Sequence, residues 1–380
     1  METLGGGYSR SCAEPLWSSA LTTSTDLTLH QLAPYIGRMK TSMARALIRR
    51  WTRPGDIVVD PFCGSGVVPL EAAACGRRVV AGDWNPYAVV LTRAKLFVPP
   101  SLTAAERRLA KTWRHSRQLL CQQDLRSVPP WVRKFFHPKT LRSALAFRDA
   151  CVEEGDDFLL SCLLAILHHQ RPGFLSYPSS HLVPYLRGNL FPRNAFPDLY
   201  EEREVFPRLQ AKLRRAFRRV PDKYSTSRQV LRIDARQFPR VRGINAIITS
   251  PPYMNELDYV RDNRLRLWFI ERDLPKGIEL IGRNRQIEFR ALIRDVCGRL
   301  APSVRTKGYF ILVVGDATRG NGRPGKTAEI AHDVFQSHLP LRAFTLHKAY
   351  EDTIPDIRRS RRGYKGTKAE TVLVYRKEPD

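Results

Sequence analysis

The sequence contains no apolar run long enough to cross a membrane and no pair of cysteines spaced as C-x-x-C. A span needs about eighteen consecutive apolar residues, and a signal peptide needs a charged start followed by an apolar run. The seven cysteines are odd in number and scattered, which argues against a disulfide framework and a zinc ribbon. We therefore expect a soluble cytoplasmic protein without a metal site.

Acidic residues are scarce relative to basic ones. The 380 residues include 63 Lys and Arg but only 37 Asp and Glu, which gives a formal net charge of +26. A field of that sign gathers polyanions, so nucleic acid is the expected partner. The alternative that composition leaves open is an organism whose proteome is basic throughout.

Short apolar runs alternate with helical patterns along much of the chain. Strands are predicted at 57–59, 79–82, 229–233, 245–249, 309–314, 343–348 and 371–375, and helices at 36–51, 67–75 and around 327–337. This alternation predicts an α/β fold, with an open, largely parallel sheet and an antiparallel end.

Three parts of the chain differ in pattern. Residues 1–28 are rich in Gly, Ser and Thr and indicate a loosely ordered arm, whereas 29–97 and 229–380 carry the strands. Residues 98–228 show helical patterns at 104–120 and 141–169, with 23 basic and 12 acidic residues. We expect an inserted, mainly helical domain that is a candidate nucleic-acid surface.

A glycine loop follows the first strand. It reads Asp60-Pro61-Phe62-Cys63-Gly64-Ser65-Gly66 and precedes a helix, so it exposes backbone N–H groups to a ligand. Asp83 ends the second strand, where a carboxylate accepts ribose hydroxyls, and Trp84 is placed to lie against an adenine. Asp234 ends the third strand and is either an adenine contact or a helix cap. The third glycine of G-x-G-x-x-G is missing, which disfavours NAD and ATP.

A second motif, Ser250-Pro251-Pro252-Tyr253, follows the strand at 245–249. Two prolines remove backbone donors and leave carbonyl oxygens that accept hydrogen bonds. Ser250 Oγ and the Pro251 carbonyl suit the two N–H groups of a base amino group, and Tyr253 suits stacking on the base. Direct transfer to that nitrogen is a matter of positioning and needs no covalent adduct.

Together, these motifs resemble the amino-group DNA methyltransferases, which make N4-methylcytosine or N6-methyladenine. The resemblance implies a class I, Rossmann-like methyltransferase fold and S-adenosyl-L-methionine as cofactor. It makes Ser250, Pro251, Pro252 and Tyr253 the catalytic motif. The implied cofactor contacts are Tyr35, Lys40, Asp60, Phe62, Cys63, Gly64, Ser65, Gly66, Asp83, Trp84, Asn85 and Asp234.

The resemblance also makes residues 98–228 a candidate target-recognition and DNA-binding region, and it implies a target. Within this family Ser at the first position of the motif is typical of cytosine-N4 enzymes, whereas adenine-N6 enzymes usually carry Asp or Asn there. We expect a DNA cytosine-N4 methyltransferase acting on a flipped or single-stranded base, with adenine-N6 as the alternative. The resemblance implies either a restriction-modification system, with a cognate restriction endonuclease as partner, or a solitary enzyme. We expect nucleoid association if the organism is bacterial.

Two further readings compete with DNA methylation. RNA guanine-N2 methyltransferases share the glycine loop and a Pro-Pro-Tyr turn, and a catalytically silent DNA-binding relative would share the fold.

A basic stretch from Arg358 to Lys368 has six basic residues and no acidic one, which indicates a phosphate-binding loop. Its basic residues are Arg358, Arg359, Arg361, Arg362, Lys365 and Lys368. Another basic run, 212–219, is equally compatible with an amphipathic helix.

Overall fold

A computed structural model gives the fold of the chain. It describes residues 26–169, 171, 173–180, 183–221, 224, 227–252, 259–273, 285–317, 327–353 and 367–379, together with short N-terminal pieces at 3–4, 8–9, 12–13 and 16–17. In this part of the chain, no helix combines the length and apolar character that spanning a membrane requires.

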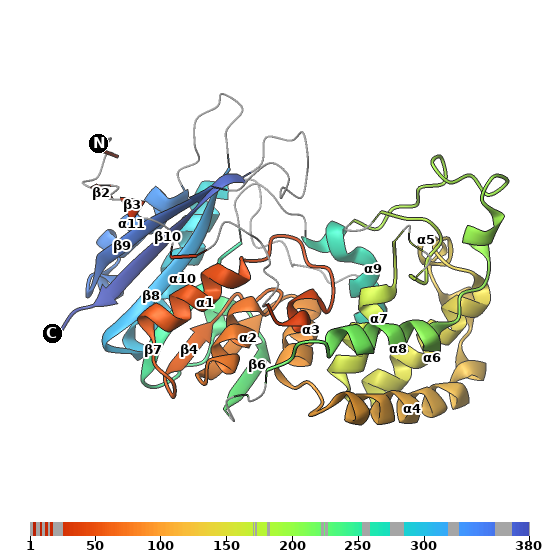
Figure 1. The fold of residues 1–380 in the computed structure, drawn as a ribbon. Helices are drawn as coiled ribbons and strands as arrows, with labels where there is room; N and C mark the ends of the chain where they lie inside the picture. The colour runs from red at the N-terminus through yellow and green to blue at the C-terminus, as the bar shows by residue number, and fades with distance from the viewer. Residues whose placement is uncertain are drawn as a thin grey trace.

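An eight-stranded sheet forms the centre of the fold (Figure 1). Its order is β3-β9-β10-β8-β7-β4-β5-β6, and β8, β7, β4, β5 and β6 run parallel while β10 runs antiparallel to β8 and β9. The strands are β3 (Cys12–Ala13), β4 (Ile57–Asp60), β5 (Arg78–Asp83), β6 (Arg228–Arg232), β7 (Ile244–Thr249), β8 (Val304–Ala317), β9 (Phe344–Thr353) and β10 (Thr367–Lys377). This is the strand arrangement of the class I methyltransferase fold, which confirms the predicted fold class.

Helices cover both faces of the sheet. The buried strands alternate their side chains between two cores, so that Val58 packs with α1 and α2 while Val59 packs with α10 and α11. In Figure 1, α1 and α2 lie in front of the sheet and α10 and α11 behind it. The bounds are α1 (Thr41–Trp51), α2 (Val67–Ala74), α3 (Pro86–Leu96), α10 (Arg285–Leu300) and α11 (Thr327–Ser337).

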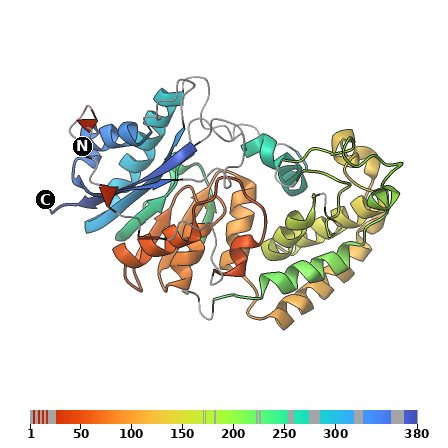
Figure 2. The same ribbon diagram turned by 45° about the horizontal axis from the view of Figure 1, so that its top comes forward.

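A helical segment lies between α3 and β6, beside the sheet at its β6 end (Figure 2). Its helices are α4 (Leu102–Gln118), α5 (Pro130–Arg133), α6 (Pro138–Glu153), α7 (Asp157–Ile166) and α8 (Val205–Ala216). The single helical pattern expected at 141–169 is in fact two helices, because Gly155 has φ +65° and Asp156 caps α7 by accepting from Leu159 N.

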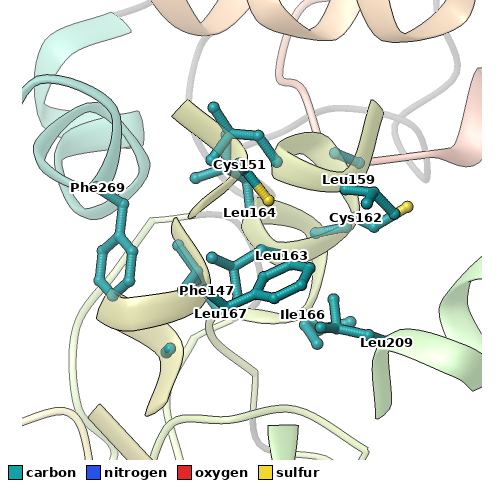
Figure 3. Close-up of a cluster of buried hydrophobic side chains, with 14 of the residues drawn as sticks. Phe147, Cys151, Leu159, Cys162, Leu163, Leu164, Ile166, Leu167, Leu209 and Phe269 are labelled. Carbon is teal, nitrogen blue, oxygen red and sulfur yellow. The ribbon is translucent and has the colours of Figure 1, made fainter. Parts of the chain in front are cut away.

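The helical segment shares a core with α3 and α9. Phe147, Leu163 and Leu209 come from α6, α7 and α8, and Phe269 comes from α9 (Tyr259–Glu271), which follows the Ser-Pro-Pro turn in sequence (Figure 3). Tyr87 and Leu91 of α3 belong to the same cluster. The segment is therefore anchored through α3 and α9, the two helices that flank the predicted site.

The N-terminal arm contributes one pairing that sequence did not predict. Cys12 and Ala13 form β3 and pair in parallel with Ala349 and Tyr350 of β9. Trp17 is buried, with its ring 5.5 Å from that of Tyr350. A short two-stranded sheet, β1 (Thr3–Leu4) with β2 (Tyr8–Ser9), precedes this pairing.

Candidate cofactor and target-base site

The two sequence motifs meet at the carboxyl edge of the sheet. β4 and β7 are neighbours, and the Oγ1 hydroxyl of Thr249 donates a hydrogen bond of 2.6 Å to Asp60 Oδ1. Asp60 opens the glycine loop and Thr249 directly precedes Ser250. One buried side-chain contact thus joins the loop to the proline turn, at the edge where open α/β sheets place their ligands.

The Asp60 carboxyl group lies in a buried environment that disfavours its ionised form. Asp60 is buried, and burial raises its pKa to about 7. The nearby Asp83 also raises this pKa, whereas the hydrogen bonds from Thr249 and from the Phe62 amide lower it. Folding therefore favours the protonated form of Asp60 in the protein without ligand.

Asp60→Asn is expected to stabilise the ligand-free protein at alkaline pH. Because the folded pKa lies above the unfolded one, the stability that Asp60 contributes is complete below about pH 4 and is lost as pH rises through 7. Asn keeps the acceptor for Thr249 without ionising. The variant should gain up to about 4 kcal/mol in free energy of unfolding at pH 8, from about three pKa units, and nothing at pH 4.

Urea unfolding of both proteins between pH 4 and pH 8 measures this difference. A gain of the same size at every pH would assign the effect to packing and contradict the burial of an ionisable carboxyl group.

The glycine loop depends on backbone conformations that glycine tolerates. Gly64 has φ +47° and Gly66 has φ +72°, and Gly66 is the residue before α2. A Cβ on Gly66 would lie 2.7 Å from Thr92 Oγ1 and 3.1 Å from the Thr92 Cα, so α3 packs directly beneath the loop. A Cβ on Gly64 would meet the Tyr35 ring at 3.5 Å. Tyr35, a predicted cofactor contact, thus lies against the loop.

Gly66→Ala is expected to destabilise the protein more than Gly55→Ala. Both residues have positive φ, but nothing lies within 4 Å of a Cβ at Gly55. The Gly55 variant should lose about 1 kcal/mol for backbone strain, and the Gly66 variant a further 1–3 kcal/mol, roughly, for crowding against Thr92. Equal losses in urea unfolding would show that α3 does not press on the loop.

Asp83 connects the loop to the end of β5. Its Oδ2 accepts from Gly64 N at 2.8 Å and its Oδ1 accepts from Asn85 N at 2.9 Å. Burial raises the Asp83 pKa to about 6, although part of the residue reaches the surface. Each carboxylate oxygen can accept a second hydrogen bond. Asp83 can therefore brace the loop and still accept from a ligand's hydroxyl groups.

The two residues after Asp83 suit a ligand as well. Trp84 is 40% exposed. Asn85 caps α3 by accepting from Tyr87 N at 2.9 Å, while its Nδ2 is buried and finds no hydrogen-bond partner among the described residues. A ligand with an acceptor would satisfy this orphan donor. The chemistry of these residues fits an adenosine-containing cofactor.

Other predicted cofactor residues are held by the protein itself. Lys40 forms a buried ion pair with Asp352 of β9, and the Ser65 carbonyl accepts from the buried Lys95. Cys63 is buried with its Sγ 3.5 Å from Thr92 Oγ1, and burial raises the pKa of its thiol well above the ordinary value. Cys63 is thus a packing residue of the loop and a poor nucleophile.

Asp234 is engaged locally. It precedes a short 3-10 helix, Ala235–Gln237, accepts from Arg236 N at 2.9 Å and pairs with the Arg236 guanidinium at 2.6 Å. The hydrogen bond from Arg236 lowers the Asp234 pKa. The helix-cap reading of Asp234 is confirmed, and its contact with adenine stays a prediction.

Sequence reasoning missed three residues that support the site: Thr92, Lys95 and Thr249. Thr92 and Lys95 lie three apart on α3 and therefore on one face of that helix. Burial lowers the Lys95 pKa to about 7. The stretch from Ala88 to Leu96 is mostly apolar, so its threonine and lysine were the sequence signal that could have indicated a buried polar role.

The target side of the site is described as far as Pro252. Ser250 and Pro252 are partly exposed and Pro251 is buried, whereas Tyr253 lies outside the described residues. The predicted phosphate-binding residues Arg358, Arg359, Arg361, Arg362 and Lys365 also lie outside them, and Lys368 lies in β10. Within the described ranges, no group of three or more His, Cys, Asp or Glu is arranged to hold a metal ion.

The second basic run packs against the protein. Lys212 donates to the Gln31 carbonyl at 3.0 Å, Arg214 pairs with Glu106 at 3.1 Å and Arg219 donates to the Asp26 carbonyl at 3.0 Å. These contacts support the amphipathic-helix reading of α8.

Comparison with known proteins supports a methyltransferase. The family model described as the RMKL-like methyltransferase domain, UPF0020, matches residues 32–123, which hold the glycine loop, Asp83 and α3. The match supports a methyltransferase function and S-adenosyl-L-methionine as the cofactor. The Ser-Pro-Pro turn lies beyond the matched residues.

Curated relatives match over short stretches. The chain is 42% identical over 57 residues to tRNA (guanine(37)-N(1))-methyltransferase 2 of Phaeodactylum tricornutum, covering 14% of this chain and 10% of the relative. It is 28% identical over 68 residues to the type II methyltransferase M.MjaII of Methanocaldococcus jannaschii, covering 18% and 13%. It is 38% identical over 63 residues to tRNA (guanine(10)-N2)-dimethyltransferase of Methanothermobacter thermautotrophicus, covering 16% and 19%. The chain thus spans between a tenth and a fifth of these relatives.

Among solved structures, TrmN from Thermus thermophilus aligns over 92% of this chain and 52% of its own, with 15% identity and a TM-score of 0.37. At that level the likeness does not bear on function.

Proposed function

We propose that this protein transfers a methyl group from S-adenosyl-L-methionine to the exocyclic amino nitrogen of a base in nucleic acid, with N4 of cytosine in DNA as the first candidate. The bond between Thr249 and Asp60 carries the proposal, because it fixes the Ser-Pro-Pro turn beside the glycine loop. A methyl donor held by the loop and a base held by the turn would lie next to one another.

The residues around Asp83 would hold the cofactor. Asp83 has acceptor capacity for ribose hydroxyls, Asn85 Nδ2 has a donor to offer, and Trp84 presents an exposed ring to adenine. The cofactor supplies an electrophilic methyl group on a sulfonium. Its positive charge also suits a site where two carboxyl groups, Asp60 and Asp83, have raised pKa values.

The turn would hold the base. Ser250 Oγ and the Pro251 carbonyl accept the two amino hydrogens, which directs the nitrogen lone pair toward the methyl group. The nitrogen itself attacks, so the protein needs no nucleophile. The burial and raised pKa of Cys63 agree with this mechanism.

The choice of cytosine in DNA rests on the resemblance of the Ser-Pro-Pro motif. The type II methyltransferase M.MjaII among the relatives is compatible with it. The other two relatives carry tRNA guanine in their names, one at N1 and one at N2. The N2 name favours the exocyclic amino group of guanine in RNA as a second candidate. A restriction endonuclease partner and a cytoplasmic, nucleoid-associated location stay predictions.

Incubation with labelled S-adenosyl-L-methionine tests the proposal. Mixed DNA and total tRNA are offered separately and then digested to nucleosides for mass spectrometry. N4-methylcytosine from DNA supports the first candidate, N6-methyladenine corrects the base, and N2-methylguanine from RNA establishes the second. Binding of the cofactor without any methylated nucleoside would leave the silent relative as the better reading.

A further inference from the structure

An exposed surface of aromatic rings and arginines lies on the helical segment, in the loop from 183 to 200. Tyr185, Leu190 and Phe196 are 50%, 64% and 41% exposed, values that large apolar side chains seldom combine within twelve residues. Arg187 and Arg193 lie between them in sequence. These five residues are called the aromatic–arginine surface below.

The arginines of this surface lie over aromatic rings. The Arg187 guanidinium carbon is 5.9 Å from the Tyr185 ring centroid, and that of Arg193 is 5.6 Å from the Tyr200 centroid. Neighbouring rings also pack together, with Phe191 and Phe196 5.5 Å apart. The surface thus presents flat rings and guanidinium planes, both of which stack on bases.

The loop is held in shape by its own contacts. Ser179 and Leu186 form an antiparallel bridge, and Arg187 N donates to the Pro178 carbonyl at 2.9 Å. Tyr200 Oη donates to the Phe191 carbonyl at 2.5 Å. Because the backbone is already ordered, its exposed side chains would bind with a smaller loss of conformational entropy.

The charge from Phe158 to Pro197 favours an anionic partner, whereas the exposed Asp198, Glu201 and Glu202 follow directly. No Asp or Glu occurs among the forty residues from Phe158 to Pro197, which include Arg171, Arg187 and Arg193. A surface that binds another protein needs exposed apolar side chains, but it can also contain acidic residues. A surface that binds nucleic acid needs exposed rings to stack on bases and few acidic residues to repel phosphates.

The surface is connected to the proposed active site through α9. Arg264 of α9 donates to the Pro184 carbonyl at 2.9 Å, next to Tyr185. α9 begins seven residues after Pro252, so the loop contacts the helix that follows the Ser-Pro-Pro turn in sequence. In Figure 1 the loop lies at the top of the helical segment. The β8 arrow also points upward, so the loop and the carboxyl end of β8 lie toward the same side of the molecule.

We propose that the aromatic–arginine surface binds the substrate strand beside the target base, with Tyr185 and Phe196 stacking on unpaired bases and Arg187 and Arg193 contacting phosphates. This inference rests on the proposed function and adds a location for the nucleic acid. An enzyme that removes a base from a duplex gains from such stacking on neighbouring nucleotides.

Fluorescence anisotropy with a labelled 20-nucleotide single strand, in DNA and RNA forms of one sequence, tests the proposal. Y185A/F196A should weaken binding of the preferred form at least fivefold, as expected for lost base stacking. R187Q/R193Q should weaken it and lower the slope of log affinity against log salt by about 1.4, since single strands give about 0.7 per contacted phosphate.

Phe97→Ala is the matched control. Phe97 is 46% exposed beneath the Arg228 guanidinium at 5.1 Å, but Arg228 begins β6 at the amino edge of the sheet. The affinity of Phe97→Ala for the strand should equal that of the wild type. All variants should bind S-adenosyl-L-methionine as the wild type does, because none of the changed residues belongs to the cofactor site.

The outcomes separate this inference from the proposed function. Wild-type affinity in both double variants, with methylation intact, would overturn the surface and leave the function standing. A wild-type protein that binds neither form of the strand would overturn both. Equal losses in F97A would also overturn the surface, because they would reflect exposed aromatic residues in general.

Discussion

Replacing Ser250 by Ala is expected to lower kcat for methyl transfer by about 100-fold, with cofactor affinity unchanged. The hydroxyl is one of two acceptors assigned to the base amino group, and the loss of an acceptor used during transfer affects rate more than binding. Ser250 follows β7 on the target side, whereas Asp83 and Asn85 follow β5 on the cofactor side. Single-turnover kinetics and calorimetry of cofactor binding measure the two effects separately.

Two further variants make the Ser250 result specific. Ser303→Ala removes a partly exposed serine immediately before β8, at the opposite edge of the sheet, and should leave kcat unchanged. Ser250→Asn restores an acceptor oxygen and should recover part of the rate lost in Ser250→Ala. If Ser250→Ala instead weakens cofactor binding, the turn belongs to the cofactor site and the assigned roles are wrong.

The sequence predicted the elements that position the site. β4, β5 and β7 are short apolar runs, each ending in a polar residue or a breaker, and they were predicted within one residue of their observed bounds. α11 was predicted around 327–337 and is observed at Thr327–Ser337. Local pattern sufficed because β4 and β7 are buried almost throughout and the buried residues of α11 recur at helical spacing.

The sequence did not predict elements whose burial depends on distant partners. α9 was missed because Asp262, Asn263 and Arg266 interrupt its apolar pattern, although all three are buried in the fold. β8 begins five residues earlier than predicted, at Val304, which pairs with Ile244 of β7. The exposed polar residues at 305–307 interrupt the apolar pattern before Tyr309 and hid this start. Tertiary context decided both cases.

The sequence pattern also did not predict the contacts between residues far apart in the chain. Thr249 meets Asp60 across 189 residues of sequence, and Lys40 meets Asp352 across 312. Both contacts follow from strand order, which local pattern does not specify. The sequence therefore predicted which residues cluster at the carboxyl edge, but not which of them are paired with each other and which remain available to a ligand.

Replacing Asp83 by Asn is expected to weaken S-adenosyl-L-methionine binding by about 10- to 100-fold at pH 8, because hydrogen bonds to a carboxylate become hydrogen bonds to a neutral amide. Asn cannot accept on both sides, so the bond from Gly64 N to the loop is weakened as well. Asp234→Asn is the comparison, since the Asp234 carboxylate is already paired with Arg236. Its loss should be smaller.

The pH dependence identifies Asp83 more sharply than the affinity alone. With a pKa of about 6, Asp83 is ionised at pH 8 and protonated at pH 5, and the cofactor's hydroxyl groups favour the ionised form. Wild-type affinity should therefore fall as pH drops through 6, while Asp83→Asn should lose the step near pH 6. Asp60 also ionises near pH 7, so the titration is repeated in Asp60→Asn, where the remaining step belongs to Asp83. A step near pH 6 that persists in Asp60→Asn/Asp83→Asn would assign cofactor binding to another group.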